Sequence, residues 1–161
     1  MNTYLEEFPN LKTVLRSFSG REQHYNWLLT DAEFHDFDRC LKYFESEVTF
    51  DDGSIAYWIT GENLYKLAFE QEPYFVWGVF SAFDKNENID LETLKPIPYA
   101  DGHSSYWNGD PRIQHPKAIA ELVFWDSEFI LLLSRNQEWS KSFRNSFGGW
   151  KDLNEHEQED M

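Results

Sequence analysis

Two pairs of short apolar runs, each joined by a tight polar turn, constrain the fold of this chain most. Residues 48–50 and 55–59 flank Asp51-Asp52-Gly53, and Asp-Gly between β-forming residues is typical of a hairpin. Residues 119–125 and 129–133 flank Asp126-Ser127 in the same way. The sequence therefore predicts two β-hairpins, which are units of an antiparallel sheet.

Further strands are expected between these hairpins. Tyr65, Leu67 and Phe69 alternate with charged or small residues, which is the period of a half-buried strand. Residues 74–83 are apolar on both alternating faces, which predicts a central strand covered on both sides. The pattern as a whole predicts an antiparallel sheet of about five to six strands.

Three helices are expected around this sheet. Apolar residues at steps of three and four predict a helix over 9–17, between Pro9 and a stop at Gly20. A second helix is expected over 31–45, because Thr30 and Glu33 have the spacing of a capping box and four apolar residues follow at helical steps. These four residues are Phe34, Phe37, Leu41 and Phe44. Residues 27–29 fit either a short strand or a hydrophobic staple onto this helix.

The last helix is expected after the second hairpin. Ser134, Asn136 and Gln137 supply capping side chains, and aromatic residues at four-residue steps follow until Gly148-Gly149. The order of elements indicates an α+β fold with helices packed on the sheet. The length of 161 residues predicts a single α+β domain over 1–153, with an acidic C-terminal tail over 154–161. Residues 84–117 hold four of the six prolines and are expected to form a long irregular loop.

The charge balance restricts the partners that this chain can bind. It carries 29 acidic and 14 basic side chains, a formal net charge of −15. Such a charge repels phosphate backbones and excludes nucleic acid as the expected partner, whereas a basic protein complements it. No apolar run approaches the roughly 20 residues of a membrane span. Cys40 is the single cysteine, and the chain starts without a secretory signal, which together favour a reducing, cytoplasmic location.

No motif of the sequence is diagnostic of catalysis. His103, Ser104 and His115 lie with carboxylates in the loop over 101–115, which leaves a hydrolase or a metal-dependent enzyme as an alternative. A small-ligand carrier is a further alternative, because 18% of the residues are aromatic. We expect no catalytic residue, cofactor or metal site, since the spacings fit no known catalytic or metal-binding motif.

The preferred hypothesis is a protein-binding inhibitor of the kind that bacterial immunity proteins represent, which would neutralise a basic toxin or nuclease. Its carboxylates would replace the phosphate groups of a substrate, and aromatic side chains would anchor the partner. The expected partner-binding residues lie in the first hairpin turn and in the long loop: Asp51, Asp52, Asp101, Tyr106, Trp107 and Asp110.

Overall fold

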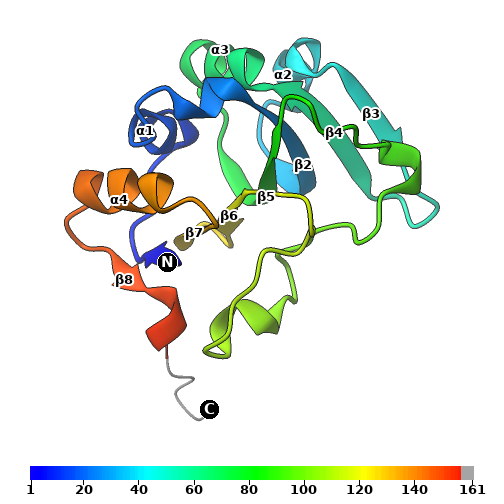
Figure 1. Ribbon diagram of the computed structural model, residues 1–161. Helices are drawn as coiled ribbons and strands as arrows, with labels where there is room; N and C mark the ends of the chain where they lie inside the picture. Colours follow the sequence, from blue (N-terminus) through cyan, green and yellow to red (C-terminus); the bar gives the residue numbers. More distant parts are fainter. Residues whose placement is uncertain (157–161) are drawn as a thin grey trace.

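The computed structural model describes residues 1–156 and contains one antiparallel sheet of eight strands in the order β3-β4-β2-β5-β6-β7-β1-β8 (Figure 1). The strands are β1 (Thr3–Leu5), β2 (Tyr25–Phe34), β3 (Ser46–Thr49), β4 (Ile55–Thr60), β5 (Phe75–Asp84), β6 (Ala120–Trp125), β7 (Phe129–Ser134) and β8 (Lys151–Asp152). The α+β class is confirmed, but the expectation of five to six strands is too low.

Four α-helices and several short 3₁₀ turns accompany the sheet in this described part of the chain. The helices are α1 (Leu11–Arg16), α2 (Phe37–Cys40), α3 (Gly61–Gln71) and α4 (Gln137–Ser146). The 3₁₀ turns are η1 (Arg21–His24), η2 (Leu41–Tyr43), η3 (Leu91–Thr93), η4 (Ser104–Trp107) and η5 (Leu153–Glu155). Helices α1 and α4 lie within the expected segments, and the Asn136 side chain caps α4 as expected.

Both expected hairpins are present, as β3–β4 and β6–β7. The expected central strand is β5, which pairs with β2 on one side and β6 on the other. Its consecutive residues Val79 and Phe80 are both completely buried, on opposite faces of the sheet. The prediction of a strand covered on both sides is therefore confirmed.

The helix expected over 31–45 is wrong, because residues 25–34 form strand β2 between β4 and β5. Asp31 and Asp36 adopt positive φ angles of 49° and 61°, and the pairing with β5 shifts register between Thr30 and Phe34. The apolar spacing typical of a helix comes instead from a bulged strand followed by α2. Pairing with two neighbouring strands outweighs the local capping signal.

The strand expected over 65–69 is also wrong, because these residues belong to α3. The Thr60 side chain caps this helix by accepting a hydrogen bond from the backbone N–H of Asn63 at 3.1 Å. Tyr65 and Phe69 stack at a ring distance of 4.3 Å, as residues four apart on a helix do. An alternation over only five residues fits the period of a strand and that of a helix, and the Thr60 cap shows that this segment is a helix.

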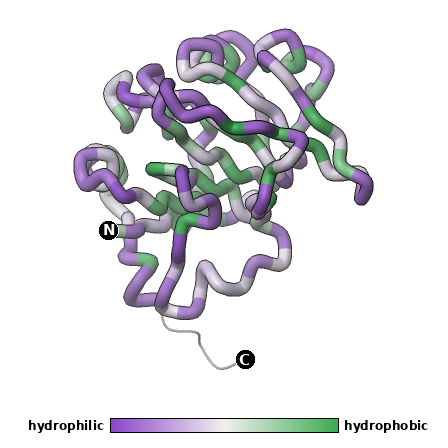
Figure 2. Tube along the Cα trace, turned by 45° about the vertical axis from the view of Figure 1, so that its right-hand side comes forward, coloured by the Kyte–Doolittle hydropathy of each residue, from purple (hydrophilic) through white to green (hydrophobic). Residues whose placement is uncertain are grey.

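The two faces of the sheet are covered differently. Helices α1, α3 and α4 pack on one face and form the main core with buried residues of β2, β4, β5, β6 and β7 (Figure 1). The loop between β5 and β6 covers the other face and, as expected, contains only short 3₁₀ turns. Hydrophobic segments run through the interior and hydrophilic segments follow the periphery (Figure 2).

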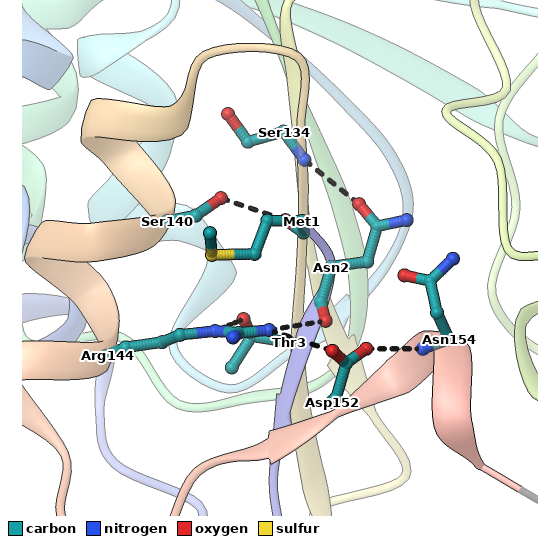
Figure 3. Close-up of polar contacts among 8 residues, drawn as sticks. All are labelled: Met1, Asn2, Thr3, Ser134, Ser140, Arg144, Asp152 and Asn154. Atoms are coloured by element: carbon teal, nitrogen blue, oxygen red, sulfur yellow. Dashed lines mark hydrogen bonds and ion pairs between the residues drawn. The ribbon is translucent and has the colours of Figure 1, made fainter.

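Arg144 of α4 joins the N-terminal strand to β8 (Figure 3). Its guanidinium donates hydrogen bonds to the Thr3 hydroxyl at 2.7 Å and to the Asn2 carbonyl oxygen at 3.1 Å. It also lies 3.7 Å from an Asp152 carboxylate oxygen and stacks on the Trp150 ring at 4.0 Å. This contact explains how strands of two and three residues persist at the edge of the sheet.

Residues near the C-terminus continue this packing up to His156. Leu153 is buried, and the His156 ring lies against Tyr4 at 5.5 Å. The rest of the expected acidic tail, residues 157–161, lies outside the described residues. None of the helices within 1–156 has the length and apolar character needed to cross a bilayer.

Candidate functional site

The turn between β3 and β4 presents Asp51 and Asp52 to solvent. Asp52 accepts hydrogen bonds from the backbone N–H of Ser54 at 2.9 Å and from its hydroxyl at 2.6 Å. These hydrogen bonds stabilise the carboxylate and lower the pKa of Asp52. Asp51 is exposed and forms no side-chain hydrogen bond in the described part of the chain. Asp52 therefore shapes the turn, whereas Asp51 is exposed to solvent.

Asp31 connects this turn to the long loop. Its carboxylate accepts hydrogen bonds from the backbone N–H groups of Ala100 at 2.8 Å and Asp101 at 2.9 Å. Asp31 also lines, with Gly53 and Ser54, a hollow of about 250 Å³. Asp101 and the hairpin turn thus lie on either side of Asp31. The sequence gives no signal for this role of Asp31, because its pattern places Asp31 in the first turn of the expected helix over 31–45.

Tyr106 has a structural position rather than a surface position. Its side chain is completely buried, and its hydroxyl donates a hydrogen bond to the Glu121 carboxylate on β6. Gln114 supports the pair by donating its backbone N–H to Glu121 at 2.8 Å and its side-chain amide to the Tyr106 hydroxyl at 2.7 Å. The expectation that Tyr106 contacts a partner is corrected here, since its ring offers no exposed surface.

Burial perturbs both titratable groups of this cluster. Desolvation raises the pKa of Glu121, although hydrogen bonds from Tyr106 and Gln114 oppose that shift. Burial, followed by the nearby Glu121 carboxylate, raises the pKa of Tyr106 well above its ordinary value. The buried polar atoms without a hydrogen-bond partner among the described residues include Thr30 Oγ1, Ser81 Oγ and His103 Nδ1.

Trp107 belongs to a group of half-buried aromatic side chains, the aromatic row, which also includes Trp77, Trp125 and Phe129. Trp125 lies between the other two tryptophans, 5.0 Å from the Trp77 ring and 5.5 Å from the Trp107 ring. Trp107 contacts Phe129 at 5.4 Å. Partly exposed tryptophan is enriched at binding hot spots, so this row supplies apolar contact area.

The aromatic row borders one end of the sheet, which we call the acidic end. Strand β2 ends there and β4 begins there, and the β6–β7 turn meets β5 through a 3.0 Å hydrogen bond from Ser127 N–H to the Val76 carbonyl oxygen. The carboxylates at this end are Glu33, Asp51, Asp52, Asp101, Asp126 and Glu128. All six are exposed, and none forms an ion pair within residues 1–156.

Asp110 lies apart from this group. Its carboxylate pairs with Arg112 at 2.8 Å. The adjacent Pro111 carbonyl oxygen accepts a hydrogen bond from the Asn2 side chain at 3.3 Å. Asn2 in turn contacts Ser134, at the other end of β7. Asp110 is therefore not combined with Asp51, Asp52 and Asp101 in one site.

The two loop histidines are separated as well. His103 packs between the rings of Tyr99 and Tyr106, whereas His115 packs against Phe83. Burial lowers the pKa of both imidazoles. No group of three or more His, Cys, Asp or Glu side chains among the described residues could hold a metal ion.

Comparison with known proteins adds no relative: no family model matches the sequence, and no curated protein matches it significantly.

Proposed function

We propose that this protein binds a basic protein partner through the acidic end and the aromatic row, and thereby inhibits it. The observation that supports the proposal is the group of six exposed carboxylates, which form no ion pair within residues 1–156, beside half-buried tryptophans. Carboxylates that have no internal cation remain available to an external one. Their field would steer a basic partner and accelerate its encounter.

The two parts of the surface would contribute differently. Exposed charges at a rim chiefly change the association rate and its salt dependence, whereas buried aromatic side chains at a centre slow dissociation. A basic toxin or nuclease is the partner class that fits best, because carboxylates can occupy the place of substrate phosphates. The protein would then act stoichiometrically, as immunity-type inhibitors do.

Capture of the partner from a lysate of the native host, at low and at high salt, is the first test. The captured basic protein is then titrated by calorimetry against the wild type and two charge-matched variants. The test variant is Asp51→Lys with Asp101→Lys, which leaves the turn-forming Asp52 intact. The control is Asp84→Lys with Glu138→Lys, two exposed carboxylates away from the acidic end: Asp84 ends β5, and Glu138 lies in the first turn of α4, 3.9 Å from Arg21.

The test variant is expected to weaken binding at least about 10-fold, with the loss mainly in the association rate. The control is expected to change it by less than about 3-fold. Equal losses in both variants would show that net charge rather than the acidic end governs binding. A failure to capture any basic protein at low salt would contradict the proposed function.

A further inference from the structure

Strand β3 is an edge of the sheet, and no described segment is hydrogen-bonded to its outer side. It pairs with β4 on one side, and no other hydrogen bond reaches Ser46–Thr49 from any segment within residues 1–156. Three of its four residues are exposed. In an antiparallel pair every second residue directs its N–H and C=O groups away from the neighbour, so β3 presents unpaired backbone groups to solvent. The opposite edge, β8, has only two residues.

A hollow of about 480 Å³ lies beside this edge. It is lined by Ser46 and Val48 of β3 and by residues 88–92 of the long loop. Val48, Ile89 and Leu91 pack in one apolar cluster at this position, and Asp90 and Glu92 are exposed beside it. A strand added to β3 would therefore find room on this face for apolar side chains.

The other face of β3 carries one acidic side chain, Glu47. Glu47 is paired in register with Tyr57, and its charge contributes to the raised pKa of that tyrosine. Neither Glu47, Asp90 nor Glu92 forms an ion pair in the described structure. Natural edge strands are often protected by lysine, proline or a bulge, none of which occurs in Ser46-Glu47-Val48-Thr49. The charge of the edge complements lysine and arginine.

We propose that β3 accepts an extended basic segment of the protein partner by strand addition. Backbone hydrogen bonds to β3 hold the segment, its apolar side chains enter the hollow over Val48, and its alternate basic side chains meet Glu47. This inference rests on the proposed function and names the part of the partner that is recognised. The segment differs from a merely cationic one by its strict alternation of basic and apolar residues.

The test uses a dye-labelled peptide with blocked ends, Lys-Val-Lys-Val-Lys-Val, and measures its binding by fluorescence anisotropy. A second peptide, Lys-Lys-Lys-Val-Val-Val, has the same composition without the alternation and is expected to bind at least about 10-fold more weakly. Two further peptides have the alternating sequence and carry N-methyl groups on every second backbone amide. The first is methylated on one set of amides and the second on the other set. Because only one set of amides faces β3, one methylated peptide should lose binding and the other should retain it.

Changes in the protein provide the matching evidence. Glu47→Lys should weaken the alternating peptide about 10-fold, and the distant Asp84→Lys should leave it unchanged. Hydrogen exchange at the β3 amides should slow only when the alternating peptide is bound. Equal binding of all four peptides, or unchanged exchange at β3, would overturn the inference.

The peptide experiment also separates this inference from the proposed function. If the captured partner responds to charge reversal at the acidic end while the alternating peptide neither binds nor competes, strand addition is wrong and the proposed function stands. If the peptide binds β3 in the expected pattern, strand addition is supported even where lysate capture recovers no basic protein.

Discussion

The hydrogen bond between Tyr106 and Glu121 should stabilise the covering loop measurably, and a double-mutant cycle can isolate it. Tyr106→Phe removes the hydroxyl and leaves the buried Glu121 carboxylate with Gln114 as its remaining donor. Glu121→Gln keeps the shape but places an amide donor against Tyr106 or Gln114. Each hydrogen bond to a charged group contributes roughly 1.5–3 kcal/mol. Each single variant should therefore lose about 2 kcal/mol of unfolding free energy.

The double variant should cost less than the sum of the two single ones, because Tyr106→Phe removes the donor of this hydrogen bond and Glu121→Gln removes the charge of its acceptor. The coupling energy is expected at about 1.5–3 kcal/mol, measured by urea unfolding followed by tryptophan fluorescence. Tyr99→Phe is the matched control: its ring is half-exposed, its hydroxyl forms no hydrogen bond among the described residues, and its cost should stay below about 0.5 kcal/mol. A coupling energy near zero would refute the role assigned to this pair.

The same cycle has a defined pH dependence. Burial raises the pKa of Glu121 in the folded protein above its value in the unfolded chain. The stability contributed by this group is therefore fully present below the unfolded pKa and is lost as pH rises through the folded pKa. The stability advantage of the wild type over Glu121→Gln should therefore decrease as the pH rises above the ordinary pKa of glutamate, about 4.3. An advantage that grows over this range would contradict the direction of the shift.

Three further predictions test the packing. Gly61→Ala should lower the free energy of unfolding in urea by about 2–4 kcal/mol, because a Cβ there would lie 2.6 Å from the Tyr25 carbonyl oxygen. Gly148→Ala is the control and should leave this free energy unchanged, since its Cβ would meet nothing within 4 Å. Arg144→Ala should cost about 2–3 kcal/mol and loosen the edge strands in hydrogen exchange, while the exposed Arg112→Ala should change neither. Burial, aided by Glu47, raises the pKa of Tyr57 to about 12. The stability that the protonated Tyr57 contributes is full below about pH 10 and is lost as the pH rises through the folded pKa of about 12. Tyr57→Phe should therefore remove one late step from a spectrophotometric titration.

The parts of the fold that the sequence predicts correctly depend on local chemistry. The β3–β4 and β6–β7 hairpins follow from turn residues between β-formers, and the Asn136 cap of α4 lies within two residues of the amide that it binds. Such features need no knowledge of distant segments. The loop between β5 and β6 was also predictable, because proline denies a strand its hydrogen bonds.

The errors occur where distant segments decide the structure. Residues 25–34 are a strand because β4 and β5 lie on both sides of them, and no local pattern contains that information. Strands β1 and β8 are too short for a periodic signal and depend on Arg144, which is 141 positions from Thr3. In the candidate site, the sequence predicts Tyr106 as an anchor on the surface. The structure buries it, because its hydroxyl bonds to Glu121 on β6, a different element. The Asp31 contact with Asp101 spans 70 positions.

These distant contacts also prepare the candidate surface for binding. Asp101 and Trp107 lie in a long loop, and ordering such a loop on binding would cost conformational entropy. Asp31 fixes the loop at Ala100 and Asp101, and Glu121 fixes it through Tyr106. The loop is thus ordered by the sheet before any partner arrives, so the cost falls on folding rather than on association. The half-buried Asp31 and the buried Glu121 hold the loop in place, and the exposed carboxylates of the acidic end would remain free for the proposed partner.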